Sequence, residues 1–213
     1  TAALMHDLGN PPFGHFGEDS LQSYFRDLFK APPSWMSEEY RKELMNLDKE
    51  DSVVGLDYTQ FDGNAEGVRV LTKLQFIETL DGLNLTCASL GAFMKYPNAA
   101  GKDKSDESYI GMHKHGVLTT EKGVLDKVHE ACGLPVVDGA VVRHPLAFLM
   151  EAADSICYLT MDIEDGLKKN LLTLSNIKEG FENLRKKNGV EFDESAKNLF
   201  DAIEREAEDR FGN

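Results

Sequence analysis

The segment HPLAFLMEAADSICYLTMDIEDG, residues 144–166, carries the strongest helical signal in the sequence. Its apolar residues recur at helical spacing. Pro145 stands near the first turn, where proline is favoured because its missing N–H is not needed there. The segment therefore predicts one long helix from His144 to about Lys169.

The same periodicity recurs outward from this segment, in shorter pieces bounded by glycine, proline and polar residues. Helices are expected over residues 18–30, 35–47, 63–80 and 83–93, from a Thr119 or Thr120 cap to about Ala131, and twice after Ser175. Loops are expected over residues 11–17, 49–58 and 98–107. No strand signal is convincing, and the β-branched pair Val141 and Val142 is the nearest to one. The sequence therefore predicts an all-α fold.

The composition is that of an ordinary globular chain, with 213 residues of which 41% are hydrophobic. This length supports one substantial core, so we predict a single domain over residues 1–213. No membrane-spanning run or signal peptide is visible, and we expect a cytoplasmic protein with no membrane partner. Cys87, Cys132 and Cys157 lie far apart among apolar neighbours and are expected to be reduced thiols in the core.

The formal net charge of −14 argues against nucleic acid as the main partner of this segment, because phosphate binding needs clustered Lys and Arg. A negatively charged substrate would have to meet a local group of cations, or a divalent metal that reverses the field at one site.

Two side chains with metal-binding atoms stand together at His6 and Asp7. Neighbouring helical positions point about 100° apart, so both reach one ion only at the edge of a helix, in a site built from several helices. For an isolated His-Asp dipeptide, a structural or surface role is commoner than metal binding.

A second pair, His15 and Glu18, lies in GNPPFGHFGED, residues 9–19. The glycines and prolines fix an irregular backbone that can hold both side chains at the rim of a site. Beside a metal, such a pair can protonate a leaving oxygen or orient a water. The alternative is a helix start with an incidental imidazole.

Asp154, Tyr158 and Asp162 follow one another at intervals of four residues in the long predicted helix, which places them on one face. Asp154 is expected to point inward, where an unpaired carboxylate would be costly. Either a metal or a salt bridge to Lys or Arg would compensate it.

These motifs together resemble the HD superfamily, and specifically the deoxyguanosine triphosphate triphosphohydrolase family and its deoxynucleotide relatives. The resemblance rests on five blocks in the family's order, from Thr1 to about Gly166: HDLGNPPFGHFGE, QFDGNAEGVRVLTKLQ, LGAFMKYP, KHG at 114–116 and RHPLAFLMEAADSICYLTMDIEDG. It implies a multi-helix HD-domain fold.

The resemblance also implies a divalent metal, Mg²⁺ or Mn²⁺, held by an upstream His, the His–Asp pair and a distal Asp, which match His6, Asp7 and Asp154. The upstream His is expected before Thr1, in a longer chain of which this would be a fragment. Ser155 departs from the family pattern, since many relatives carry an acidic residue there.

By the same likeness, His15 and Glu18 match the catalytic acid and base for attack on the α-phosphate of a deoxynucleoside triphosphate, which would release deoxynucleoside and inorganic triphosphate. Lys95 and Lys114 match positions that approach the triphosphate, with Tyr96 beside them and Asn64 in a block that borders the phosphates. Tyr158 and Asp162 match positions that pack on the sugar and bond its 3′ hydroxyl.

The resemblance implies a homo-oligomer as well, and single-stranded DNA as an effector that regions outside this chain would bind. Two other functions stay open at this stage. One is an HD phosphohydrolase for another nucleotide, and the other is a regulatory module that binds nucleotide or single-stranded DNA without chemistry.

Overall fold

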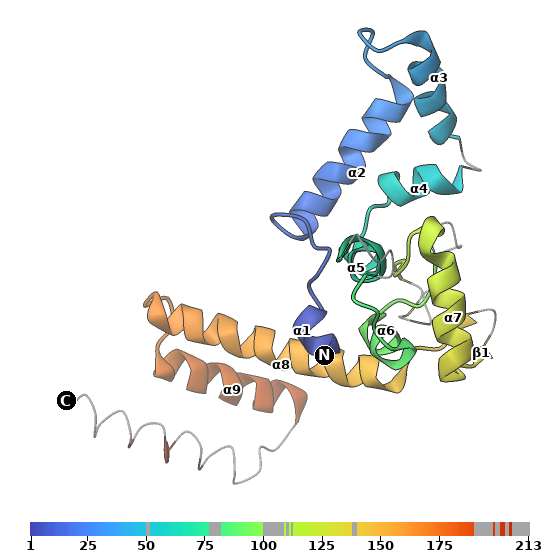
Figure 1. The fold of residues 1–213 in the computed structure, drawn as a ribbon. Coiled ribbons are helices and arrows are strands. Elements are labelled where there is room, and N and C mark those ends of the chain that lie inside the picture. Colours follow the sequence, from blue (N-terminus) through green and yellow to red (C-terminus); the bar gives the residue numbers. More distant parts are fainter. Residues whose placement is uncertain are drawn as a thin grey trace. The chain divides into compact units, whose positions relative to one another are not determined.

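The computed structural model describes residues 1–49, 52–76, 82–99, 109, 111, 113–137, 140–189, 198, 201, 202 and 205. Its elements follow in the order α1 (Ala2–Met5), α2 (His15–Lys30), α3 (Glu38–Leu47), α4 (Val53–Thr59), α5 (Gly63–Arg69), η1 (Val70–Leu74), α6 (Cys87–Phe93), η4 (Thr119–Glu121), α7 (Lys122–Cys132), β1 (Val136–Val137), β2 (Ala140–Val141), α8 (Pro145–Lys168) and α9 (Leu174–Asn188) (Figure 1). Within the described residues, the only named strands are β1 and β2, an antiparallel pair with Val136 opposite Val141. The predicted all-α fold is confirmed.

The chain divides into two compact units, residues 1–154 and 155–213. Helix α8 contributes its first part to the first unit and its remainder to the second. The prediction of one domain over residues 1–213 stays a prediction.

Most predicted helices occur close to their expected bounds, but the expected loop over residues 49–58 is wrong in its second half. Ser52 accepts a hydrogen bond from the Gly55 N–H and starts α4. Tyr58 of α4 then packs on Phe25 of α2, with ring centroids 4.9 Å apart. A capping side chain and an aromatic contact across helices therefore make a helix of a segment without a strong apolar pattern.

The helix expected over residues 63–80 is shorter than predicted. After α5 the backbone widens into the π-helix η1, and it turns extended at Gln75. Phe76 has a φ of 56°, in the left-handed region that a helix cannot contain. Residues 77–80 of the predicted helix lie outside the described residues.

The threonines expected to cap the helix before Gly133 have other partners. The Thr119 hydroxyl and N–H both donate to the buried carboxylate of Asp57, and the Thr120 hydroxyl donates to Glu121. Gly133 ends α7 as expected, with a left-handed φ of 60°. The loop expected over residues 98–107 is described only at Asn98 and Ala99, and most of the chain after Gly189 lies outside the described residues.

The hydrophobic core of the first unit lies between α1, α5 with η1, α6 and α7. Its buried members are Met5, Val68, Leu71, Leu90, Phe93, Met94, Val117, Leu125 and Val128. Cys87 and Cys132 pack against this core as free thiols, as expected. Cys157 is exposed, so the prediction of a core thiol is wrong there, because its side of α8 faces solvent.

The loop after α1 lies directly on the backbone of α5. Gly9 has a φ of 97°, and a Cβ built on it would lie 2.2 Å from the Gly67 backbone nitrogen. A Cβ on Gly67 would lie 2.3 Å from the Leu8 carbonyl oxygen and 2.6 Å from Cζ of Phe93. Only glycine at both positions allows the two backbones to approach this closely.

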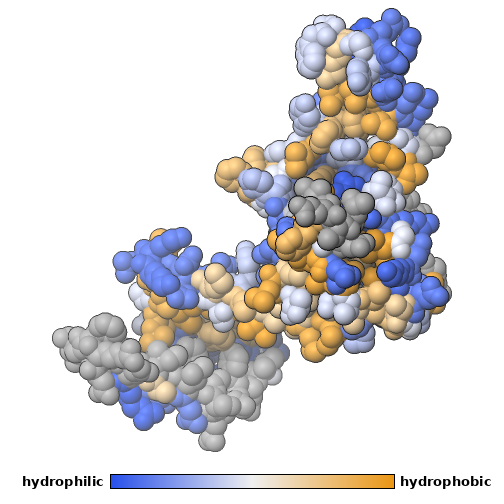
Figure 2. All heavy atoms as spheres, viewed as in Figure 1, coloured by the Kyte–Doolittle hydropathy of each residue, from blue (hydrophilic) through white to orange (hydrophobic). Residues whose placement is uncertain are grey.

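Helix α8 carries many exposed hydrophobic side chains, and apolar surface is visible on the face drawn in Figure 2. The exposed residues include Leu146, Leu149, Ile156, Leu159 and Met161. Among the described residues, no helix has both the length and the hydrophobicity needed to cross a membrane.

The contact between Gly9 and Gly67 gives a stability prediction. Gly67→Ala is expected to lower the free energy of unfolding by about 1 to 3 kcal/mol, because the added methyl group overlaps backbone atoms that cannot turn aside. The measurement is urea unfolding followed by circular dichroism.

Gly123→Ala is the matched control, since a Cβ at Gly123 meets no described atom within 4 Å and its φ is ordinary. It should raise the stability by about 0.5 to 1 kcal/mol through helix propensity. Equal effects of the two substitutions would contradict the close approach of the two backbones.

Candidate functional site

The three predicted metal ligands meet at the end of α1. His6 Nε2 lies 3.3 Å from Asp7 Oδ2 and 3.2 Å from Asp154 Oδ1 on α8. His6 Nδ1 donates a hydrogen bond to the Ala3 carbonyl oxygen at 2.8 Å, which fixes the orientation of the ring. The side chain of Asp154 is 43% exposed, so its expected inward position is only partly found.

This arrangement leaves His6 Nε2 facing two carboxylate groups. Because Nδ1 donates to a carbonyl, Nε2 of a neutral imidazole carries a lone pair, which two carboxylates would repel. A proton or a cation between them would remove that repulsion. The imidazole nitrogen suits a divalent transition metal, and the two carboxylates suit hard cations such as Mn²⁺ and Mg²⁺, so the whole set fits Mn²⁺ better than Mg²⁺. Within the described ranges, however, no three His, Cys, Asp or Glu side chains are arranged as a finished metal site.

Asn10 links this group to the start of α5. Its side-chain amide donates to Asp7 Oδ1 at 2.9 Å. Its own Oδ1 lies 2.2 Å from where a Cβ on Gly63 would be, and Glu18 Oε1 lies 3.1 Å from the same point. The glycine at position 63 therefore lets Asn10 and Glu18 approach the same backbone.

Glu18 is buried, although it belongs to the first turn of α2. Its Oε1 accepts a hydrogen bond of 2.8 Å from the Gly63 N–H, and its Oε2 lies 3.7 Å from Lys114 Nζ. Lys114 Nζ also lies 3.4 Å from Oδ2 of Asp62, which is likewise buried. One lysine therefore faces two buried carboxylates from different parts of the chain.

Asp62 also fixes the position of Asn64. The Asp62 side chain caps α5 by accepting from the Asn64 N–H at 2.9 Å, and it accepts from the Asn64 side-chain amide at 2.8 Å. Four groups, Glu18, Asp62, Asn64 and Lys114, thus form one hydrogen-bonded and ion-paired cluster.

The charge of Lys114 is stabilised by this cluster. Burial on its own would lower the pKa of Lys114, but the attraction of Asp62 and Glu18 outweighs it and raises the pKa above the ordinary value of 10.5. Lys114 therefore remains a cation at any pH where the protein would act.

A third group lies on α8, one helical turn before Asp154. Lys95 Nζ lies 3.0 Å from Glu151 Oε1, and Arg143 Nη1 donates to Glu151 Oε2 at 2.7 Å. Tyr96 stands beside both cations, with its ring centroid 5.9 Å from Lys95 Nζ and 5.5 Å from Arg143 Cζ.

Three more predicted site residues have exposed side chains. His15 is exposed at the first residue of α2, one turn before Glu18. Tyr158 and Asp162 are exposed on the part of α8 that belongs to the second unit.

Four further side chains of the site were not predicted: Asn10, Asp62, Arg143 and Glu151. Asp62 had a usable signal, because it stands directly before GNAEG as an Asp at a helix start. Asn10 donates to Asp7 in the same loop and Arg143 bonds the nearby Glu151, whereas the pairing of Glu151 with Lys95 joins distant segments.

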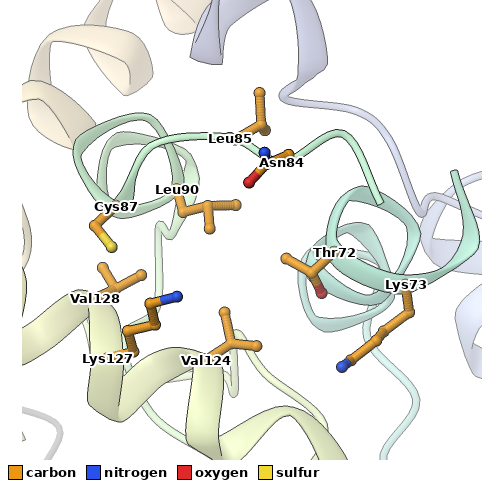
Figure 3. A pocket seen from close by; sticks show the side chains of 9 residues that line it. All are labelled: Thr72, Lys73, Asn84, Leu85, Cys87, Leu90, Val124, Lys127 and Val128. Atoms are coloured by element: carbon orange, nitrogen blue, oxygen red, sulfur yellow. The ribbon is translucent and has the colours of Figure 1, made fainter. Parts of the chain in front are cut away.

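Two cavities lie apart from these side chains. One of about 200 Å³ lies between η1, α6 and α7, and Figure 3 shows its lining, with Lys73 and Lys127 among apolar side chains. Another of about 420 Å³ is lined mainly by small and apolar residues of α1, α6 and α8. None of the predicted site residues lines either cavity.

The position of Lys114 gives a prediction that depends on pH. Lys114→Met is expected to lower the free energy of unfolding by about 1 to 2 kcal/mol at neutral pH, because it leaves two buried carboxylates without their cation. Solvent limits this loss, since one-third of the lysine side chain is exposed. The raised pKa of Lys114 contributes stability below 10.5 that is lost as the pH rises through the raised value. The difference from the unsubstituted protein should therefore shrink above about pH 10.5 in urea unfolding series.

Lys127→Met is the control, since Lys127 is exposed and no ion pair with it occurs among the described residues. It should change the stability by less than about 0.5 kcal/mol. A Lys114→Met deficit that does not vary between neutral and strongly alkaline pH would contradict the electrostatic role.

Known proteins resemble the chain over most of its length, although no family model matches it. A deoxyguanosinetriphosphate triphosphohydrolase-like protein of Pseudomonas aeruginosa is 40% identical over 184 residues, which are 83% of this chain and 37% of that protein. One of the same description from Listeria monocytogenes is 37% identical over 89% of this chain and 38% of its own length. A deoxyguanosinetriphosphate triphosphohydrolase of Serratia proteamaculans is 32% identical over 83% of this chain and 35% of its own length.

The chain thus spans a little over a third of the length of these relatives. The matched segments cover more than four fifths of this chain. Over most of its length, the chain is therefore similar to a segment of deoxyguanosinetriphosphate triphosphohydrolase-like proteins, consistent with a fragment of that family.

Proposed function

We propose that the chain belongs to a metal-dependent hydrolase that cleaves deoxynucleoside triphosphates at the α-phosphate and releases deoxynucleoside and inorganic triphosphate. One observation carries the proposal: a buried carboxylate, Glu18, accepts from the Gly63 N–H and faces Lys114, and Asn10, which donates to Asp7 of the His6, Asp7 and Asp154 group, lies beside the same Gly63. The names of the relatives, which are triphosphohydrolases of deoxyguanosine triphosphate, support the substrate class.

His6, Asp7 and Asp154 are the residues that would hold Mg²⁺ or Mn²⁺. When bound, such an ion supplies Lewis-acid chemistry that neutralises phosphate charge and makes water a stronger nucleophile near neutral pH. The hydrogen bond from His6 Nδ1 to the Ala3 carbonyl keeps Nε2 available for this role.

Proton transfer would fall to Glu18 and His15. Glu18 accepts a hydrogen bond from the Gly63 N–H and lies 3.7 Å from the Lys114 ammonium, and from this position it can orient or deprotonate the attacking water. His15 lies one helical turn earlier and is exposed, where it can give a proton to the departing sugar oxygen.

Binding of the triphosphate would use the lysines that the carboxylates of the site hold in place. Lys114 and Lys95 supply point charges, with Tyr96 and Asn64 beside them. In a chain with a net charge of −14, such local cations are needed to attract a highly negative substrate. Tyr158 and Asp162 would contact the deoxyribose, with the Tyr ring disfavouring a 2′ hydroxyl.

The reaction is tested by incubating the purified protein with each of the deoxynucleoside triphosphates and Mn²⁺, and separating the products. Intact inorganic triphosphate is the expected product, and a chelator in excess should abolish its release. Orthophosphate or pyrophosphate as the first product would contradict attack at the α-phosphate, and turnover that survives the chelator would contradict the metal.

The role of His15 gives a separate prediction. His15→Ala should lower kcat by about a hundred- to ten-thousandfold, because the leaving oxygen loses its proton donor, while KM changes little. Steady-state kinetics measures both constants. His129→Ala on α7 is the matched control and should keep the unsubstituted kcat; an unchanged kcat in His15→Ala would rule out the assignment.

A further inference from the structure

Arg143 is the most deeply buried charged side chain near the site, with 2% of its surface exposed. Its guanidinium lies between two aromatic rings, 5.5 Å from the Tyr96 centroid and 5.3 Å from the Phe148 centroid. Its Nη1 donates to Glu151 Oε2 at 2.7 Å. The rings and the carboxylate together fix the guanidinium in one orientation.

Arg143 also leaves donors unused. Its Nε and Nη2 are buried and have no hydrogen-bond partner in the structure as described. A buried donor without an acceptor costs free energy, and an apolar side chain would fill the same space without that cost. A contribution to folding stability therefore does not explain an arginine at this position.

Glu151 is shared by two cations of unequal exposure. Lys95 bonds one carboxylate oxygen from the more open side, where 27% of its side chain is exposed, whereas Arg143 bonds the other oxygen from the interior. Without Arg143, the carboxylate would cancel the charge of Lys95 and repel an approaching anion. With Arg143, the group of three carries one net positive charge.

The ionised state of Glu151 is consistent with this arrangement. Burial would raise the pKa of Glu151, but the hydrogen bonds from Lys95 and Arg143 outweigh burial and lower the pKa below its usual value. Glu151 is therefore a carboxylate that holds both cations at neutral pH.

We infer that Arg143 is a positioning residue which, through Glu151, holds Lys95 in place and keeps the Lys95, Glu151 and Arg143 group positive, so that this group binds the phosphates of the substrate. The inference rests on the proposed function for the identity of the anion. It adds two residues, Arg143 and Glu151, that act on the substrate only through Lys95.

The charge balance of the group can be tested with inorganic triphosphate as the probe, in the full chain, by titration calorimetry. Arg143→Met removes the buried charge and should weaken triphosphate binding by about tenfold. The double variant Arg143→Met/Glu151→Gln again has one net positive charge, on Lys95, which can still donate to the glutamine amide oxygen, and it should bind within about threefold of the unsubstituted protein. Lys127→Met, which removes an exposed lysine on α7, is the charge control and should bind normally.

Recovery of triphosphate binding in the double variant distinguishes a role of Arg143 in the charge of the group from a role in the fold alone. If Arg143 only supported the fold, the second substitution would add damage, and the double variant would bind no better than Arg143→Met; that result, or normal binding by Arg143→Met, overturns the inference. Thermal unfolding of the double variant should occur at or above the Tm of the unsubstituted protein, because the unpaired buried donors are gone. Failure of the unsubstituted protein itself to bind triphosphate would remove the proposed function together with this inference.

Discussion

The backbone contact between Gly9 and α5 determines how the rest of the first unit is placed. Because neither Gly9 nor Gly67 has a Cβ, the loop after α1 reaches the helix directly, and Asn10 arrives beside Gly63. The same loop carries His6 and Asp7 at one end and leads into α2 with Glu18 at the other. One close approach of two backbones therefore sets the distance between the candidate metal ligands and the candidate catalytic carboxylate.

The two lysines of the site are each paired with carboxylates. Lys114 lies against Glu18 and Asp62, and Lys95 lies against Glu151. Such pairs keep the positive groups in position before any ligand arrives, so less reorganisation is needed when an anion binds. The charge balance of the two groups differs, since Lys95 and Arg143 share one carboxylate whereas Lys114 faces two.

Features that depend on neighbouring residues were predictable from the sequence, and features that depend on contacts between helices were not. Helix α8 was readable because its apolar period extends over many turns, whereas α4 depends on a capping serine and on an aromatic contact with α2 that only the folded chain provides. Candidate site residues could be named from short motifs. The contacts that join these residues could not be predicted, since the bond from Gly63 to Glu18 spans 45 positions and the ion pair between Lys95 and Glu151 joins segments far apart in the sequence.

The exposed hydrophobic side chains of α8 affect how the protein should be handled in solution. Leu149, Ile156, Leu159 and Met161 are each more than half exposed. Apolar surface of this kind drives association between copies as concentration rises. Preparations of the isolated chain should therefore be compared at several concentrations by light scattering, and kinetic or calorimetric data should be taken where the scattering mass no longer depends on concentration.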